Sequence, residues 1–422
     1  MRAFSSMFLL ALWTAPLAAQ STPESYTLLS DVRYLASDQL GGRITGSPGA
    51  DSAAAYIARR FAQAGLQPSS QGWFQPFEVS RDAPAVAQLR LGALNGRNVI
   101  GVLPGKDPVL RNEIVIVGAH YDHLGLGGPG SGALDPDVRS QVHNGADDNA
   151  SGAAALIHIA TRLAANPPGR TVVFIAFSGE ELGLLGSAYY VKHPLYPLAG
   201  TEAMVNLDMV GRLRNKRLIV YGVETAKEFP ALLDSLNWYA GFDLKAQGDG
   251  YGPSDQQSFF IAKRPVLHLF TDLHEDYHRA SDDWDKINAD GLLRVADYTT
   301  GIVRALANRP GPLTFVDAAP PNPHAGTVAT PGYGAYLGTI PDMTDNPGGV
   351  EISGVRPGSP AEKAGLTAGD IIVKIGDTDV TNLQAMTDAL RSHVAGDVVQ
   401  VQYLRGGNRL SSTVTLGVRP AS

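Results

Sequence analysis

The sequence has 422 residues, a formal net charge of −7 and an isoelectric point near 5.8, which argues against nucleic acid as a partner. This length leaves room for two or three domains with sizeable cores. The sequence contains no cysteine, which excludes disulfides, thiolate metal ligands and a lipid-anchoring cysteine. Any metal site must therefore be built from histidines and carboxylates.

The first twenty residues have the pattern of a secretory signal peptide. A positively charged start, Met1-Arg2, precedes an apolar core at 7–13 and a small-residue end at 15–20. We expect cleavage near Ala19 and a secreted or periplasmic mature protein. No later run approaches the roughly 20 apolar residues that a spanning helix needs, so we expect no membrane span.

Residues 21–308 are predicted to form an α/β domain, with a doubly wound, mostly parallel sheet flanked by helices. The segment 25–68 is predicted to be mostly helical and to pack on this sheet. Short apolar runs typical of buried parallel strands occur at 113–119, 171–177, 203–207 and 265–270. Polar residues follow the first three runs directly, and open α/β sheets bind ligands at the carboxyl ends of their strands.

His120 and Asp122 follow the first of these strands. A neutral imidazole is a common zinc ligand, and a carboxylate nearby can accept the other ring N–H and so fix the tautomer. We therefore predict that His120 is a metal ligand and that Asp122 orients it.

Three acidic segments follow along the chain. Asp147 and Asp148 precede an Ala-rich helix predicted at 153–160, and one of these carboxylates could bridge two cations. The cluster by itself is more typical of helix N-capping.

Glu180 and Glu181 follow the second strand and precede a helix predicted from Leu182 onward, so one could bind metal while the other handles a proton. Paired glutamates at a helix start also commonly offset the helix dipole. Asp208 follows the third strand, where an Asp is otherwise a common turn residue.

Residues 274–278 read His-Glu-Asp-Tyr-His, which matches the H-E-x-x-H pattern of zincin metalloproteases. That pattern has its meaning only on a helix, where the two histidines share a face. Here it follows a strand and precedes a polar segment, so we predict a loop and not a zincin helix.

Taken together, these motifs resemble the dinuclear zinc aminopeptidases of metallopeptidase family M28, a group that also contains glutaminyl cyclases. Five segments carry the resemblance, in the family's order: 118–122, 145–152, 177–183, 206–209 and 277–282. The resemblance extends upstream to 36–49 and covers about 26–305. The chain departs from the family at 254–259, which often contains a His, and at Arg279-Ala280, where a Pro is common. These departures concern the substrate pocket.

The resemblance implies two zinc ions per chain. It implies that Asp148 bridges them, that His120 and Asp208 complete one site, and that Glu181 and His278 complete the other. Glu180 would be the general base, and Tyr277 would hydrogen-bond the developing oxyanion, although an ordinary packed tyrosine is nearly as common there. The resemblance also implies a cis peptide bond between Asp148 and Asn149.

The sequence beyond residue 308 predicts a linker and a second domain. Residues 309–330 are rich in Pro, Ala and Gly, and 331–422 resembles a PDZ domain of the bacterial protease-associated type. A helix is predicted from Asn382 to His393. In a PDZ groove, backbone amides of the loop at Tyr336, Leu337 and Gly338 could hold the terminal carboxylate of a peptide. The alternative is that this domain only packs on the first one.

The sequence therefore predicts a secreted dinuclear zinc exopeptidase, in the first place an aminopeptidase that acts on peptides or proteins. Alternatives on the same scaffold are glutaminyl cyclisation, carboxypeptidase action and dipeptidase action. An alternative from another class is a non-catalytic protein that binds peptides through its PDZ domain. That alternative predicts missing metal ligands, and the sequence lacks none of them.

Overall fold

The structure is a computed structural model. It describes residues 22–79, 94–128, 131–134, 141–248, 250 and 254–317, followed in the C-terminal part by 335–341, 348–355, 358–381, 385–386, 389–390, 392–393 and 395–417. The predicted signal peptide and most of the predicted linker lie outside these residues. Within the described part, no helix is both long enough and apolar enough to span a bilayer.

The first domain is built on a nine-stranded sheet with the order β1-β3-β5-β4-β6-β9-β7-β8, and β2 pairs with β3. Its strands are β1 (Gln67–Pro68), β2 (Phe74–Val79), β3 (Leu94–Leu103), β4 (Ile114–His120), β5 (Thr171–Phe177), β6 (Thr201–Leu207), β7 (Arg217–Tyr221), β8 (Asp243–Ala246) and β9 (Val266–Phe270). The four central strands, β5, β4, β6 and β9, are parallel, whereas β3 and β7 join them antiparallel. The predicted doubly wound, mostly parallel architecture is confirmed at the centre of the sheet, and the strands β3 and β7 that flank this centre run antiparallel to it.

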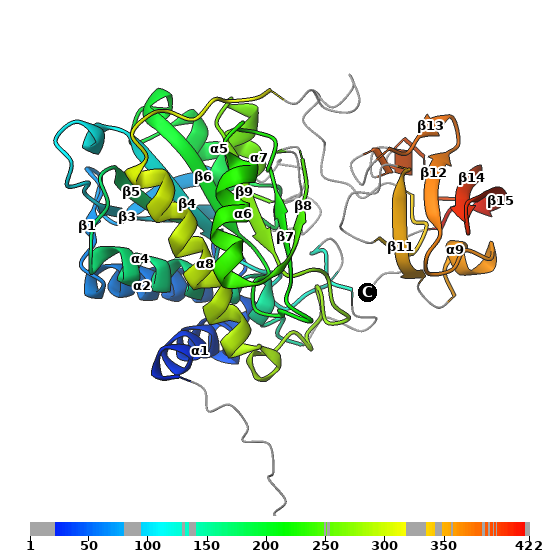
Figure 1. The fold of residues 1–422 in the computed structure, drawn as a ribbon. Coiled ribbons are helices and arrows are strands. Elements are labelled where there is room, and N and C mark those ends of the chain that lie inside the picture. The colour runs from blue at the N-terminus through cyan, green and yellow to red at the C-terminus, as the bar shows by residue number, and fades with distance from the viewer. Residues whose placement is uncertain are drawn as a thin grey trace, which may run out of the picture.

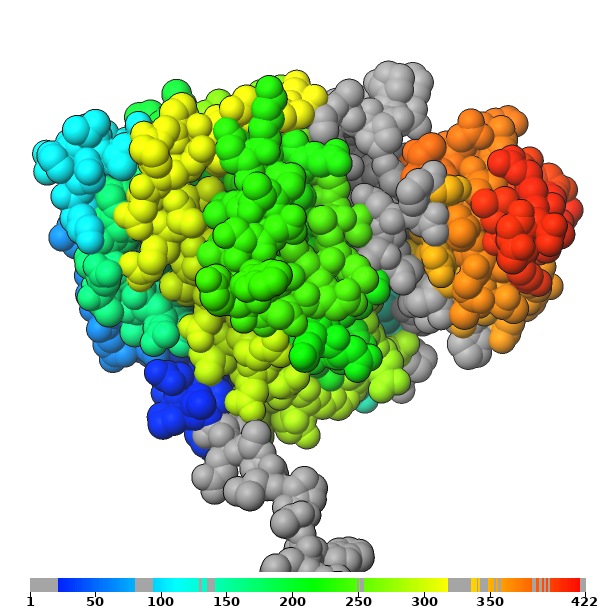
Figure 2. Space-filling view, in the orientation of Figure 1, coloured from blue at the N-terminus to red at the C-terminus, as the bar shows by residue number. Residues whose placement is uncertain are grey.

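Helices cover both faces of this sheet (Figure 1). The helices are α1 (Pro23–Leu35), α2 (Pro48–Gln63), α4 (Gly152–Ala164), α5 (Leu185–Lys192), α6 (Phe229–Ala240), α7 (Gln256–Ile261) and α8 (Ala289–Asn308). Short helical turns are η1 (Asp38–Arg43), η2 (Leu110–Asn112), η3 (Ala146–Ser151), η4 (Leu198–Gly200) and η5 (Trp284–Lys286). Figure 2 shows α8 and α6, in yellow and green, side by side at the surface.

Alternating side chains of the buried strands pack into two separate hydrophobic cores, one on each face of the sheet. In β4, Val115 and Val117 face the core formed with α1, α2, α4, α6 and α8. The neighbouring Ile114 and Ile116 face the opposite core, to which α5 and α7 contribute Tyr190 and Phe259. Because both faces are covered, the strands are apolar throughout, which explains why their sequences lack the alternation of a half-exposed strand.

The C-terminal domain has its own antiparallel sheet and its own core. Its elements are β10 (Thr339–Pro341), β11 (Val350–Val355), α9 (Pro360–Lys363), β12 (Ile371–Ile375), β13 (Thr378–Asp379), β14 (Val398–Arg405) and β15 (Asn408–Thr415). The sheet order is β10-β11-β12-β14-β15, with β13 paired to β12. Leu337, Ile352 and Val401 are among its buried core residues. Half of the residues of the helix predicted at 382–393 lie outside the described residues.

Candidate metal centre

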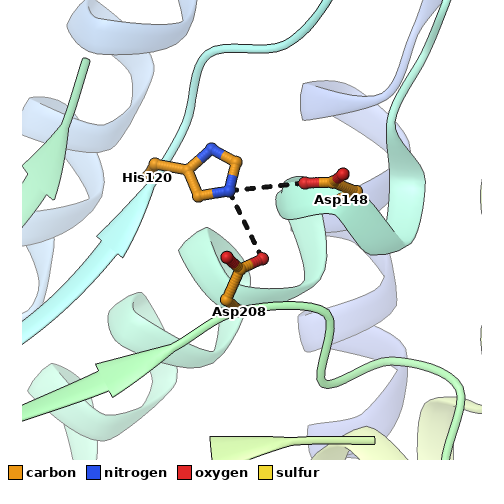
Figure 3. Close-up of side chains that lie close together, drawn as sticks. All are labelled: His120, Asp148 and Asp208. Carbon is orange, nitrogen blue, oxygen red and sulfur yellow. Dashed lines mark hydrogen bonds and ion pairs between the residues drawn. The ribbon is translucent and has the colours of Figure 1, made fainter. Parts of the chain in front are cut away.

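The polar side chains predicted to bind metal meet at the carboxyl ends of the central strands. His120 is the last residue of β4, Asp208 follows β6, and Glu181 follows β5 after a short turn. Asp148 lies in η3, between β4 and α4, and faces His120 and Asp208 (Figure 3). Because β5, β4 and β6 are parallel neighbours, their ends bring these residues to one edge of the sheet.

His120, Asp148 and Asp208 form the first of two donor groups. The Nε2 atom of His120 lies 3.3 Å from Asp148 Oδ1 and 3.3 Å from Asp208 Oδ1. A tetrahedral zinc ion with bonds of about 2.0–2.1 Å places neighbouring donor atoms about 3.3 Å apart. The spacing of these atoms therefore fits a zinc ion at their centre.

His278, Asp148 and Glu181 form the second group. The Nε2 atom of His278 lies 3.2 Å from Asp148 Oδ2 and 3.3 Å from Glu181 Oε2. The two oxygens of Asp148 thus face two different imidazoles, as the bridging ligand of a dinuclear centre must. The structure brings together all five residues that the sequence singled out as ligands.

The second nitrogen of each imidazole shows why a cation fits here. Nδ1 of His120 lies 3.2 Å from the Asp122 carbonyl oxygen, and Nδ1 of His278 lies 3.1 Å from that of Gly132. A carbonyl can only accept, so Nδ1 carries the proton in the neutral ring and Nε2 presents a lone pair. That lone pair faces two carboxylate oxygens, an arrangement that a shared cation stabilises. The chain's own residues therefore fit two metal ions.

The surroundings of the centre shift the pKa values of the two adjacent glutamates, Glu180 and Glu181, in opposite directions. Burial raises the pKa of Glu180 well above its ordinary value, and Glu181 and Asp208 add to this rise against the opposing effect of His120. Burial also acts to raise the pKa of Glu181, but His278 and other partners outweigh it and lower that pKa to about 2. Such a separation is typical of one carboxylate that stays ionised as a ligand and one that exchanges protons.

Asp122 holds a different position from the predicted one. Its backbone carbonyl, and not its carboxylate, is the near partner of His120, since the carboxylate lies 3.8 Å from Nδ1. The carboxylate instead accepts hydrogen bonds from Thr45 Oγ1 at 3.0 Å and from the Glu180 amide at 3.2 Å. Asp122 therefore fixes the turn that carries Glu180 as well as the ring of His120.

His123 is a site residue that the sequence interpretation missed. Its Nδ1 lies 2.7 Å from Glu181 Oε1, and it also falls within 4.8 Å of donor atoms of Asp148 and Glu181. The 2.7 Å contact is a hydrogen-bond length and is shorter than the spacing expected between two zinc ligands. His123 therefore fits as a donor that orients Glu181, while His278 fits as the ligand. Its position three residues after His120 was the available signal.

Asn149 links the bridging Asp148 to the segment of Asp208. The fully buried side chain of Asn149 donates to the Leu207 carbonyl at 3.0 Å and accepts from the Met209 amide at 3.2 Å, so it holds the backbone on both sides of Asp208. The Asp148–Asn149 peptide bond is cis, as the resemblance implied.

Arg43 provides a buried positive charge beside the centre. It is fully buried, and its guanidinium donates only to backbone carbonyls, those of Tyr121, Leu35, Asn144 and Gly145. Burial lowers the pKa of Arg43 to about 10 against the opposing effect of nearby carboxylates, so the group is a cation at neutral pH. It ties the segment directly after His120 to the segment directly before η3, the helical turn that contains Asp148.

Comparison with known proteins agrees with this geometry. Residues 98–303 match the model of peptidase family M28, and residues 335–416 match a PDZ domain. The chain contains a peptidase family M28 domain. Both matches lie inside the ranges predicted for the two domains.

Several named relatives of the M28 domain are aminopeptidases. The chain is 30% identical over 230 residues to aminopeptidase YwaD of Bacillus subtilis, an alignment that covers 51% of this chain and 47% of that protein. The chain therefore spans about half the length of this curated relative.

Solved structures share the fold of the M28 domain. An aminopeptidase from Aneurinibacillus superposes with a TM-score of 0.55 at 20% identity, covering 69% of this chain and 96% of that one. The zinc aminopeptidase BSAP from Bacillus subtilis superposes with a TM-score of 0.53 at 20% identity, covering 69% and 97%. At this level of identity, the likeness shows the fold.

The H-E-x-x-H segment of the M28 domain is a loop of turns, as predicted, so the zincin geometry is absent from it. His278 faces the centre, whereas His274 points its Nε2 at Asp147 Oδ2, 3.2 Å away. Tyr277 stacks its ring on that of His278, with centroids 3.9 Å apart. This stacking places Tyr277 beside the centre.

The segment where the M28 domain departs from its family lies behind Asp208. Ser254 Oγ donates to Asp208 Oδ2 at 2.8 Å, and the Asn206 side chain donates to Ser254 Oγ at 2.9 Å. Gln256, in the same segment, is fully buried, and its Oε1 accepts from Asn206 Nδ2 at 3.3 Å. This segment therefore supports the proposed ligand Asp208, whereas the sequence interpretation had assigned it to the substrate pocket.

In the PDZ domain, one of the three amides predicted to hold a carboxylate is already engaged. The Tyr336 amide donates to the Gly417 carbonyl at 2.9 Å, within an antiparallel bridge between these residues. Gly338 has φ +84°, and a Cβ there would lie 2.3 Å from Ser359 Cβ, which explains the glycine. The amides of Leu337 and Gly338 are the remaining candidates.

Proposed function

We propose that this protein is an exported, dinuclear zinc aminopeptidase that releases residues one at a time from the amino ends of peptides. The observation that carries the proposal is the shared carboxylate of Asp148, whose two oxygens lie 3.3 and 3.2 Å from the imidazoles of His120 and His278. A carboxylate placed between two such imidazoles suits a pair of metal ions and has no comparable structural purpose. The aminopeptidase names of its relatives support the choice of reaction.

Zinc is the cation that suits this donor set of two imidazoles and three carboxylates. Two such ions, when bound, would lower the pKa of water and polarise the carbonyl of the scissile peptide bond. We assign His120 and Asp208 to one ion, Glu181 and His278 to the other, and Asp148 to both.

Glu180 is the general base of the proposed reaction. Its Oε2 lies 3.9 Å from the Nε2 atom of His120, so it borders the centre without completing a donor group. The raised pKa of Glu180 suits a carboxylate that takes a proton from the attacking water and returns it to the leaving amine. Tyr277 is placed next to a ligand and would donate its phenol hydrogen to the developing oxyanion.

The PDZ domain is proposed to bind a peptide, with the amides of Leu337 and Gly338 holding its terminal carboxylate. Export is proposed from the signal-like pattern of residues 1–20 alone.

A pool of synthetic peptides tests the reaction directly. Each peptide is made with a free and with an acetylated amino end, incubated with purified protein and zinc, and followed by mass spectrometry. We expect stepwise loss of residues from free amino ends only. Cyclised amino-terminal glutamine, cutting from the carboxyl end, cutting restricted to dipeptides, or no change would each contradict the aminopeptidase assignment in favour of a rival function. Metal analysis of the same protein is expected to give two zinc ions per chain.

A further inference from the structure

Three consecutive backbone amides beside the metal centre are bound by a single residue, Asp282. Its Oδ2 accepts the amide hydrogens of Asp147 at 2.8 Å and of Asp148 at 3.1 Å, and its carbonyl accepts that of Ala146 at 3.1 Å. The side chain of Asp282 is fully buried. One anion thus fixes the backbone on which the shared carboxylate of Asp148 is mounted.

Arg212 holds Asp282 in place and neutralises it. Its Nη2 lies 2.9 Å from Asp282 Oδ1 and 3.2 Å from Asp276 Oδ2, and its side chain is 12% exposed. Asp282 therefore uses one oxygen for the amides and the other for the guanidinium. Burying the carboxylate is acceptable because both oxygens are satisfied by hydrogen bonds.

These residues come from three segments that each carry a proposed ligand. Arg212 lies four residues after Asp208, and Asp276 and Asp282 lie on either side of His278. The amides belong to the segment of Asp148. These hydrogen bonds therefore connect the segment of the bridging ligand Asp148 to the segments of Asp208 and His278, one ligand from each metal position. The connection is made by protein groups alone and does not need the metal. A second contact reinforces the connection, since Asp147 Oδ1 accepts from the Gly211 amide at 2.6 Å.

We propose that Asp282, held by Arg212, is a positioning residue that orients Asp148 and thereby sets the affinity of the centre for its cations. The inference rests on the proposed function, because it needs Asp148 to be the bridging ligand. The two hydrogen bonds fix the rotation of the two peptide groups that precede Asp148. Without them, the carboxylate loses the alignment in which its oxygens face His120 and His278, and a small misalignment weakens both metal positions together.

Two substitutions of Asp282 distinguish its role as the acceptor of the amides from its charge pairing with Arg212. Asp282→Ala removes the acceptor of both amides. Asp282→Asn retains a carbonyl oxygen that can accept from them, while its amino group faces Arg212 in place of the carboxylate. The affinity for zinc should therefore fall most in Asp282→Ala and less in Asp282→Asn.

The matched control is Arg170→Met. Arg170 is a fully buried arginine of the same domain, which pairs with Glu113 at 2.7 Å at the amino end of β5, at the opposite end of the sheet. Its loss should destabilise the fold without touching the metal centre.

The experiment measures the dissociation constant of zinc in the full chain by competition with a chromophoric chelator. We expect Asp282→Ala to weaken zinc binding by about 10–100-fold, the range found for residues that orient ligands. The absorption spectrum of the cobalt-substituted protein should change as well. Arg170→Met should lower the unfolding temperature but retain the zinc affinity and the cobalt spectrum of the wild type.

A zinc affinity of Asp282→Ala equal to that of Arg170→Met would overturn the inference and leave Asp282 as an ordinary stabilising residue. If Asp282→Ala does not fold, Arg212→Met takes its place with the same expected weakening and the same criterion. Failure of the wild-type chain to bind zinc is a separate result, because it would contradict the proposed function itself.

Discussion

The same three strands carry charged residues at both of their ends, and the two ends differ in how those charges are balanced. At the amino ends of β4, β5 and β6, Arg170 donates to Glu113 at 2.7 Å, and Glu202 accepts from the Leu313 amide at 2.5 Å and from Arg309 at 3.4 Å. Each carboxylate there has a cationic partner within the protein.

The carboxyl ends of those strands are not balanced in this way. Four carboxylates, those of Asp148, Glu180, Glu181 and Asp208, gather around the imidazoles of His120 and His278. Burial of such an excess of negative charge is unfavourable until cations join it. The comparison teaches that matched charges mark the structural end of this sheet and unmatched charges mark the functional end.

Asp148→Ala should produce the largest effect, because it removes the one ligand that both metal positions share. We expect zinc affinity to fall by more than about 100-fold, beyond the range for residues that only orient a ligand, and no detectable peptide release. Metal analysis after dialysis and an assay with a free-amino peptide check both expectations. Retention of both ions would refute the bridging assignment.

Glu180→Gln should separate metal binding from turnover. The variant keeps every proposed ligand, so its metal content should equal that of the wild type. The loss of the proton acceptor should lower kcat by about 10²–10⁴-fold, the usual contribution of a general base. Metal content and kcat measured on one preparation decide this, and equal loss of metal in Glu180→Gln and Asp148→Ala would sink the division of roles.

The unbalanced end should also make the metal-free protein less stable as the pH rises above about 6.5. Burial alone lowers the pKa of the His120 and His278 imidazoles, but surrounding carboxylates raise both well above 6.5. Their contribution to stability is full below pH 6.5 and is lost as the pH rises through the raised pKa values. Glu180, whose pKa is also raised, acts in the same direction.

Thermal unfolding followed by circular dichroism in the presence of a chelator measures this dependence. The unfolding temperature of the metal-free protein should fall as the pH rises above about 6.5, whereas added zinc should remove the decline. A metal-free protein that becomes more stable with rising pH would contradict the charge imbalance.

Arg170→Met tests the balanced end. It leaves the Leu306 and Arg309 carbonyls, which Arg170 binds at 3.2 and 2.5 Å, without their donor. Unpaired buried acceptors of this kind cost about 1–3 kcal/mol each, so we expect a clear loss in the free energy of unfolding by urea. Activity per bound zinc should stay at the wild-type value. A lower value would contradict the assignment of the amino ends of the strands to a purely structural role.

Gly338→Val should have the smallest effect on the metal centre. Valine is strained at φ +84° and would collide with Ser359, so the PDZ domain should unfold at a lower temperature. Among the described residues, the buried cores of the two domains share no member. Hydrolysis of short peptides should therefore be unchanged, and a reduced rate would mean that the PDZ domain supports the M28 domain directly.

Continuous apolar runs and parallel topology predicted the central strands and the edge at which His120, Glu181 and Asp208 meet, because they leave little freedom, whereas the roles of Asp148 and His278 came from the family resemblance. The observed strand β5 has the predicted bounds, and β4 differs from its prediction by one residue. The antiparallel edges were not predicted, since the pairing of β3 with β5 joins segments about 75 residues apart and has no local signal.

Turn geometry set the limit of prediction within the site. The helix expected from Leu182 begins at Leu185, because Gly183 and Leu184 both adopt positive φ and insert a turn. The partner of His120 is the Asp122 carbonyl rather than its carboxylate, and His123, which the sequence interpretation did not single out, contacts Glu181. Which of several neighbouring polar groups faces inward depends on the backbone of the irregular segment after β4, which residue types do not determine.

The position of Arg43 has a consequence for the smallest piece of this chain that could work alone. Arg43 and Thr45 precede the segment that matches the peptidase family, 98–303, yet they bind the backbone of Tyr121, Asn144 and Gly145 and the carboxylate of Asp122. A fragment trimmed to the matching segment would keep every proposed ligand and lose the cation that joins two of their loops. A minimal fragment with an intact candidate centre should therefore extend back through η1 and Thr45, well upstream of residue 98, where the match to the family model begins.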